Sequence, residues 1–174
     1  DNQQGVIQQT GEDDLRLDFR AGLDNRGGEI ASNSHALTLS TSQLLNQNGT
    51  LLHTGSGGMS ITSEGALDNG EGTIAANGNI KLDADNLTNH GGKISAAQGD
   101  IQLTARHGVD NSQGNIIASG DIQLQAENLT NRHGQIGTAQ RGSVNLTTSG
   151  LLDNQQGTIT AFDALRSEER RVGK

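Results

Sequence analysis

The chain of 174 residues has no proline, cysteine, tryptophan or tyrosine, and only two phenylalanines, Phe19 and Phe162. These absences exclude a core built on aromatic side chains. The absence of cysteine excludes disulfide bonds and thiolate metal sites, although it assigns no cellular compartment. The sequence also contains no signal peptide and no apolar run long enough to span a bilayer. We therefore expect any export signal to lie outside these residues.

Apolar residues make up only 30% of the chain and the net charge is −8, a balance typical of disordered segments. Disorder is not expected here, because disordered segments lack the regular apolar spacing that runs through this chain. Residues 1–165 hold 18 acidic and 8 basic side chains, whereas residues 166–174 carry a net charge of +2. Such an acidic surface repels polyanions, so we expect no nucleic acid or heparin partner for the repeats.

What the chain does contain is one motif, apolar-x-Asn-x-x-Gly-x-apolar, which recurs eight times at intervals of 20 to 23 residues. The first copy, at Asn2, Gly5 and Ile7, is truncated. The motif asparagines are Asn2, Asn25, Asn46, Asn69, Asn89, Asn111, Asn131 and Asn154. A fixed period of this length indicates a solenoid, in which each repeat buries its apolar face only against its neighbours.

Apolar and polar residues alternate between the motifs, which predicts half-buried strands. The first residues of these alternating stretches are Leu15, Leu37, Met59, Ile80, Ile101, Ile122 and Val144. A second alternating stretch follows the motif glycine, as in Ile74 to Ala76, and a short third segment surrounds the Leu-x-Asn step. Helices are not expected, because apolar residues do not recur at helical spacing and glycine is frequent.

Glycine and asparagine are expected to form the corners, because both tolerate the left-handed backbone of tight turns. Gly78, Gly99, Gly120 and Gly142 mark a second corner. Short strands repeated in one order and direction stack in parallel rather than as hairpins. The prediction is an all-β fold, a parallel β-helix of seven to eight coils, about 35 Å long at a rise of about 4.8 Å per coil.

The spacings between motif asparagines alternate between long and short, so the unit is a pair of coils with a period of 42 to 44 residues. The residue before the asparagine follows this alternation: Asp1, Asp24, Leu45, Asp68, Thr88, Asp110, Thr130 and Asp153. Carboxylates about 4.8 Å apart repel by roughly 0.9 kcal/mol even in water. We infer that the carboxylates mostly skip a coil for this reason, with the Asp1 and Asp24 pair as the exception.

The motif asparagines occupy equivalent positions, so their amides are predicted to form a hydrogen-bonded ladder along the rod. A row of polar ligand-binding groups is the competing interpretation. We favour the structural role, because an amide ladder satisfies its own hydrogen bonds and every coil contributes one amide.

No constellation of residues points to catalysis. Polysaccharide-cleaving β-helices are the alternative class, but their clefts need long loops and clustered charges, whereas these corners are short and uniform. The histidines His35, His53, His90, His107 and His133 are interpreted as solvated loop residues. The Gly-Gly-x-Gly-x-Asp repeats of calcium-binding β-rolls are missing. We therefore predict no enzyme activity and no catalytic, cofactor-binding or metal-binding residue.

The repeats resemble a known family. Residues 67–76 and 79–89, with the sequences LDNGEGTIAA and NIKLDADNLTN, are similar to the haemagglutinin repeats of filamentous haemagglutinin-type exoproteins. Related repeats build the stalks of contact-dependent growth-inhibition toxins. The resemblance covers residues 1–165 and implies a right-handed β-helix on the surface of a Gram-negative bacterium. It also implies secretion of the full-length protein by an outer-membrane two-partner-secretion transporter.

Residues 166–174 are predicted to be a separate, non-native basic tail that resembles translated adapter sequence, with a native solvated linker as the alternative. Since the chain begins within a motif and shows no capping repeat, we expect it to be a segment of a longer array. Neither the secretion domain nor the toxin domain of the resembled family is seen.

Two functions follow as hypotheses. The first is a non-catalytic stalk of a secreted adhesin or toxin-delivery filament, which holds a distal domain away from the cell and does not insert into the membrane. Coils without proline or cysteine suit export in the unfolded state. The second is an adhesive module that itself binds a glycan or a receptor on a host or neighbouring cell, although it lacks the aromatic platforms typical of sugar sites.

Overall fold

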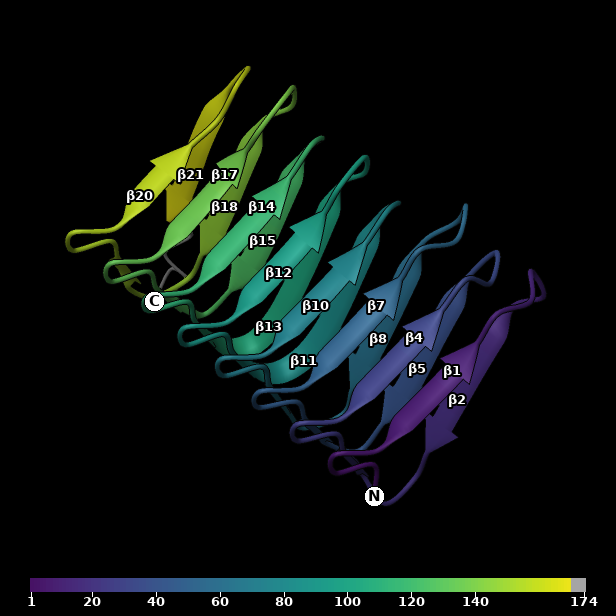
Figure 1. Ribbon diagram of the computed structural model, residues 1–174. Coiled ribbons are helices and arrows are strands. Elements are labelled where there is room, and N and C mark those ends of the chain that lie inside the picture. Colours follow the sequence, from purple (N-terminus) through teal and green to yellow (C-terminus); the bar gives the residue numbers. More distant parts are fainter. Residues whose placement is uncertain (170–174) are drawn as a thin grey trace.

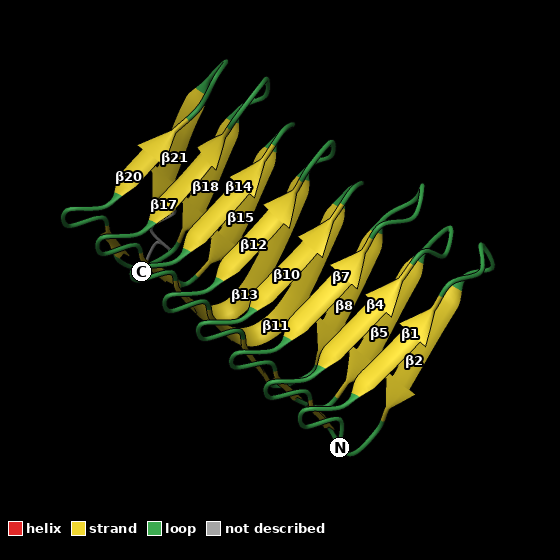
Figure 2. Cartoon of the chain, in the orientation of Figure 1, coloured by secondary structure: helices red, strands yellow, loops and turns green. Residues whose placement is uncertain are grey.

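The computed structural model describes residues 1–169 as a β-solenoid of about eight turns, with about 22 residues per turn (Figure 1). The described part of the chain consists of strands and loops (Figure 2). The predicted all-β parallel coil is thus confirmed. Within this part no helix is long and apolar enough to cross a membrane.

Two long sheets run along the rod, and each coil contributes one strand to each sheet (Figure 1). The first sheet contains, in spatial order, β1 (Val6–Gln9), β4 (Glu29–Ser32), β7 (Thr50–His53), β10 (Thr73–Ala76), β12 (Lys93–Ala96), β14 (Asn115–Ala118), β17 (Gln135–Thr138) and β20 (Thr158–Thr160). The second contains β2 (Leu15–Phe19), β5 (Leu37–Thr41), β8 (Met59–Ser63), β11 (Ile80–Thr88), β13 (Ile101–Asp110), β15 (Ile122–Ala126), β18 (Val144–Thr148) and β21 (Leu165–Glu169). Neighbouring strands are therefore about one coil apart in sequence.

Shorter strands form a third row at the Leu-x-Asn step. They are β3 (Leu23–Asp24), β6 (Leu44–Leu45), β9 (Ala66–Asp68), β16 (Asn128–Thr130) and β19 (Leu152–Asp153). In two coils this step is part of the long strands β11 and β13, whose pairing shifts register between Ala84 and Asn86. The predicted short third segment is therefore present, and it merges with its predecessor in the middle of the rod.

All strand pairs are parallel and in register with the motif. Ile74 in β10 lies between Leu51 in β7 and Ile94 in β12, and none of the three is exposed to solvent. In β11, Ile80 and Leu82 are buried whereas Lys81 between them is exposed. Alternation thus sends every second side chain into one continuous apolar stack between the sheets, which is the main source of stability in a fold without aromatic core residues.

The motif corner is built differently from the prediction. The left-handed residue in each coil is the one before the motif glycine, with φ between 54° and 64° at Gln4, Gly27, Asn48, Glu71, Gly91, Gln113, His133 and Gln156. The motif glycines themselves are not left-handed. The expectation that they supply the left-handed turn is therefore wrong.

Close packing between coils explains these glycines instead. An added Cβ would lie between 2.0 and 2.2 Å from the backbone oxygen of the motif asparagine in the preceding coil at Gly28, Gly49, Gly72, Gly92, Gly114, Gly134 and Gly157. Real Cβ atoms do not approach a carbonyl oxygen so closely. Glycine is required here because one backbone passes directly over another.

Strand β21 crosses the boundary predicted after residue 165. Leu165 pairs with Val144 and Glu168 with Thr147, so the parallel ladder continues through Glu169. Whether residues 166–174 are native stays a prediction. Residues 170–174 of that segment lie outside the described residues.

Candidate functional site

The motif asparagines form the predicted ladder. Each Nδ2 donates a hydrogen bond to Oδ1 of the asparagine in the next coil, and the seven bonds from Asn2 to Asn154 measure 2.6 to 2.8 Å. Every donor points toward the C-terminal end, so the amide dipoles align along the rod. Such aligned chains of hydrogen bonds polarise and strengthen one another.

The ladder amides also fasten the corner. Nδ2 of Asn111 lies 3.2 Å from the carbonyl oxygens of Gly114 in its own turn and of Gln135 in the next coil. The six asparagines from Asn25 to Asn131 are completely buried. Buried, mutually bonded amides offer no group to a ligand, which supports the structural interpretation over a ligand-binding row.

A row of carboxylates lies beside the ladder. Asp24, Asp68, Asp110 and Asp153 each accept a hydrogen bond from the backbone N–H two residues later in the chain. This local bond is the Asx-turn arrangement that fixes a bend in the backbone. The aspartates therefore shape the corner, in addition to alternating along the rod.

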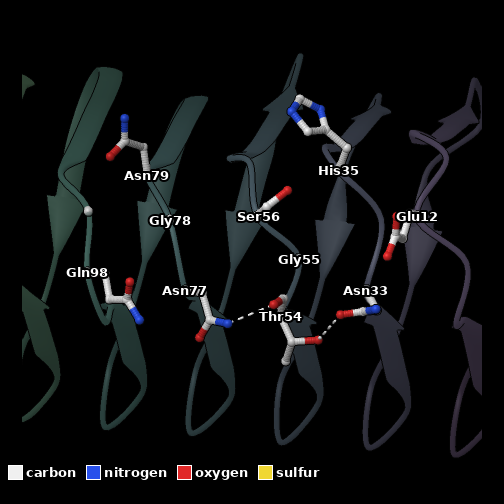
Figure 3. A pocket seen from close by; sticks show the side chains of 11 residues that line it. Glu12, Asn33, His35, Thr54, Gly55, Ser56, Asn77, Gly78, Asn79 and Gln98 are labelled. Atoms are coloured by element: carbon white, nitrogen blue, oxygen red, sulfur yellow. Dashed lines mark hydrogen bonds between the residues drawn. The ribbon is translucent and has the colours of Figure 1, made fainter.

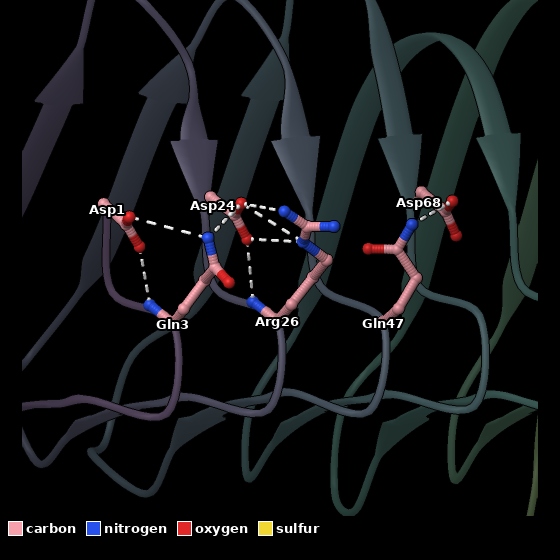
Figure 4. A network of polar contacts seen from close by, with 6 residues as sticks. All are labelled: Asp1, Gln3, Asp24, Arg26, Gln47 and Asp68. Carbon is pink, nitrogen blue, oxygen red and sulfur yellow. Dashed lines mark hydrogen bonds and ion pairs between the residues drawn. The ribbon is translucent and has the colours of Figure 1, made fainter.

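Neighbouring side chains donate hydrogen bonds to these carboxylates (Figure 4). Gln3 Nε2 lies 2.9 Å from an oxygen of Asp24 and 3.5 Å from one of Asp1, so one amide bridges the pair that breaks the alternation. The hydrogen-bonded guanidinium of Arg26 lowers the pKa of the Asp24 carboxyl. Arg132 lowers the pKa of Asp153 in the same way, from the preceding coil.

The histidines do not share one environment. His35, His90, His107 and His133 are exposed, as predicted, but His53 is completely buried at the end of β7. The interpretation of His53 as a solvated loop residue is therefore wrong. His53 follows Leu51 by two positions, so strand alternation directs its ring into the interior.

The second corner, between the two long sheets, contains an open hollow of about 660 Å³ (Figure 3). Residues from five successive coils line it: Glu12, Asn33, His35, Thr54, Gly55, Ser56, Asn77, Gly78, Asn79, Gln98 and Gly99. The expectation that uniform corners leave no cleft therefore holds only in part. Short corners form no tall walls, but differences of one or two residues between them leave this depression.

The lining of the hollow is polar and mostly uncharged. Asn77 Nδ2 donates a hydrogen bond of 2.7 Å to the carbonyl oxygen of Thr54, and Thr54 Oγ1 lies 3.4 Å from Asn33 Oδ1 (Figure 3). His35 has 70% of its side chain exposed and lies 3.3 Å from Asp14. Glu12 is the one carboxylate among the lining residues. The arrangement suits hydrogen bonding to hydroxyl or amide groups and lacks paired carboxylates for acid and base catalysis.

The sequence carries a signal for this hollow. Asn33, Thr54 and Asn77 each directly follow the last residue of a first-sheet strand, so they are spaced like the motif asparagines. Single polar residues in corners are common, and only the stacking of coils turns them into one surface. In residues 1–169 no group of three or more histidine, cysteine or acidic side chains is arranged to hold a metal ion.

A family model described as the haemagglutinin repeat matches residues 8–71 and 75–156 of the chain. The two matched stretches together cover the ladder from Asn25 to Asn154. No curated protein and no solved structure matches the sequence.

Proposed function

We propose, since the chain belongs to the haemagglutinin-repeat family, that it is a non-catalytic structural segment of a secreted, cell-surface filament. In this role it is a stalk that holds a distal adhesive or toxic domain away from the cell. The observation that carries the proposal is the uninterrupted pairing of equivalent residues through all eight coils. A ladder without a break transmits load along one axis and gives a shaft its stiffness.

The mechanical role rests on three parallel systems of contacts. Backbone hydrogen bonds of two sheets, the apolar stack and the asparagine ladder all run along the same axis. Eight coils at a rise of about 4.8 Å span about 35 Å. In the proposed filament many such segments follow one another, and export uses an outer-membrane two-partner-secretion transporter of a Gram-negative bacterium.

Removal of one whole pair of coils tests the shaft. Deletion of residues 69–110 joins Asp68 to Asn111, which restores the Asp-Asn step and keeps every strand in register. We expect a folded rod that is shorter by about 9.6 Å, measured by small-angle X-ray scattering. Deletion of residues 69–99 is the matched control, since it joins β9 to the start of β13 and should not fold into a continuous rod. An unfolded product from the first deletion would refute modular stacking.

An adhesive module is the second candidate, and the polar hollow at the second corner favours it. Its open amide and hydroxyl groups match the hydroxyls of a glycan or the backbone of a receptor on a host or neighbouring cell. Saturable binding of the purified chain to cells, lost on Asn77→Ala or on the outward substitution Lys81→Glu, would support this candidate. The stalk proposal predicts that this segment alone shows no saturable binding to cells. A polysaccharide-cleaving activity is the least favoured candidate, and a degradation assay on polygalacturonate tests it.

A further inference from the structure

His53 occupies a position that is filled by small side chains in the neighbouring coils, whereas the first coil has Gln9 there. It lies in register with Ser32 of β4 on one side and Ala76 of β10 on the other. The next coils continue this row with Ala96 and Ala118. An imidazole therefore replaces a hydroxyl or a methyl group at one point of the interior stack, and it is 0% exposed.

The buried ring has no hydrogen-bond partner among the described residues. Neither Nδ1 nor Nε2 of His53 is bonded, although a buried unsatisfied polar atom is costly. The adjacent serines are occupied with one another, since Ser32 Oγ and Ser34 Oγ lie 2.6 Å apart and Ser34 donates to the carbonyl oxygen of Ala36. The interior at this point therefore offers the ring no side-chain partner.

Burial is the largest influence on the charge of the ring. Burial lowers the pKa of His53, and the nearby charge of His35 acts in the same direction. The backbone groups of His35, Ser32 and Gly57 raise the pKa of His53 and offset the lowering by burial only in part. From β4 and β10 the ring meets Ser32 and Ala76, and residues 54–58 contain no ionisable side chain. His35 is thus the titratable neighbour on the elements that pack around the ring.

The corner that closes over His53 is weakly held. No backbone N–H from Gly55 to Gly58 donates a hydrogen bond to a described residue, and the same holds for Gly78 and Asn79 in the next corner, whereas the two corners after that bond through Gln98 and Gly120. Three of the four residues are glycines, which gain more conformational freedom on release than other residues. An added Cβ at Gly55 would lie 1.6 Å from the carbonyl oxygen of Ser34, so the backbone of this corner passes close to the preceding coil although Gly55 donates no hydrogen bond to it.

We propose that residues 53–58 form an acid-sensitive opening in the rod, in which protonation of His53 releases the glycine corner and turns the imidazolium outward into the polar hollow. The hollow adjoins this corner, since Gly55 and Ser56 line it together with Glu12. Outside, the charged ring gains water. The rest of the described rod stays closed, because no other described coil has an ionisable side chain at this position.

The direction of the effect follows from proton linkage. The closed coil holds His53 neutral, whereas the open coil lets it titrate near the ordinary pKa of 6.5. The free energy that favours the closed state over the open state is therefore largest above that pKa, and it decreases as the pH falls below it. If the closed ring stays neutral throughout, the open population rises about tenfold between about pH 7.5 and about pH 5.5.

Hydrogen exchange of the whole chain tests the proposal. After correction for intrinsic rates, acidification from about pH 7.5 to about pH 5.5 should raise exchange about tenfold at the amides of Thr54 and Asn77. Both amides now donate across this corner, to the carbonyl oxygens of Ser32 and His53. Exchange at the equivalent amides Ala97 and Ser119 should not change. The variant His53→Ala, which places the residue of the following coils at this position, should abolish the pH dependence, and His35→Ala should retain it.

Titration of the ring by NMR provides a readout that does not depend on any variant folding. The His53 resonances of the wild-type chain should titrate below the ordinary histidine pKa of 6.5, together with the loss of amide protection at the corner. Titration of His53 at the ordinary histidine value without loss of protection would overturn the proposal. An equal pH response in wild type and His53→Ala would also overturn it. If the alanine variant does not fold, His53→Ser takes its place in this comparison.

Discussion

Replacement of Asn111 by alanine is the sharpest test of the ladder. The side chain lies in the middle of the rod, is completely buried and donates and accepts within one chain of amides. Asn89 Nδ2 donates to its Oδ1 at 2.7 Å, and its own Nδ2 donates to Oδ1 of Asn131 at 2.7 Å. The substitution removes both bonds and the two weaker ones to the corner carbonyls.

The size of the effect follows from what the substitution leaves behind. Asn131 Oδ1 loses the Nδ2 donor from Asn111 and stays buried, and an unsatisfied buried acceptor costs about 1–3 kcal/mol. The Nδ2 group of Asn89 keeps its bonds to the carbonyl oxygens of Gly92 and Asn115. With the cavity that replaces the amide, we expect Asn111→Ala to lower the free energy of unfolding by about 2–5 kcal/mol.

Urea unfolding followed by circular dichroism measures this change. Ser112→Ala is the matched control, because Ser112 adjoins the ladder but its hydroxyl makes no hydrogen bond to a described residue, and it should alter stability by less than about 0.5 kcal/mol. The double variant Asn89→Ala with Asn111→Ala should cost less than the sum of the single variants, because they share a bond. An Asn111→Ala protein as stable as the Ser112→Ala control would refute the ladder as a source of stability.

Two further substitutions test the close approach of coils and the spacing of carboxylates. Gly92→Ala places a Cβ 2.2 Å from a carbonyl oxygen of the preceding coil and should destabilise the rod strongly. Gly108→Ala should be tolerated, because its added Cβ would lie 3.6 Å from the nearest atom. Equal melting temperatures of the two variants would contradict the packing explanation. Thr88→Asp places a carboxylate in register with Asp68 and Asp110, and about 0.9 kcal/mol of repulsion from each should lower the melting temperature more at about 0.01 M than at about 1 M salt. A loss of stability that is independent of salt would refute the electrostatic explanation.

Much of the rod could be predicted from the sequence because its information is local and repeated. Strand alternation places Ile80 and Leu82 inside without reference to any other coil, and the equal spacing of the asparagines places their amides in one row. The buried position of His53 was also within reach, since it has the same phase as Ser32 and Ala76. Its polar, glycine-rich surroundings favoured a loop and obscured the alternation.

The parts that could not be predicted depend on contacts between coils. The role of Gly72 becomes apparent only when the carbonyl oxygen of Asn46 is placed 2.2 Å from its missing Cβ. The hollow likewise depends on stacking, because Asn33, Thr54 and Asn77 are regularly spaced in the sequence but form one surface only when the coils are stacked. Sequence patterns determine which way a side chain points, whereas close approach and surface shape emerge from the three-dimensional arrangement.

The two corners of each coil differ in how strongly their residues are constrained. At the motif corner, the backbone oxygen of each asparagine leaves no room for a Cβ in the next coil, and the glycine there keeps the coils close enough for the amide row to continue. The opposite corner carries no buried amide row, and its length varies between three and five residues from coil to coil. Variation there leaves the core and the ladder intact, which is why the hollow, the glycine segment and the buried His53 all occur at that corner. In a filament built from such coils, residues at this second corner can change from coil to coil while the sheets and the asparagine ladder stay the same.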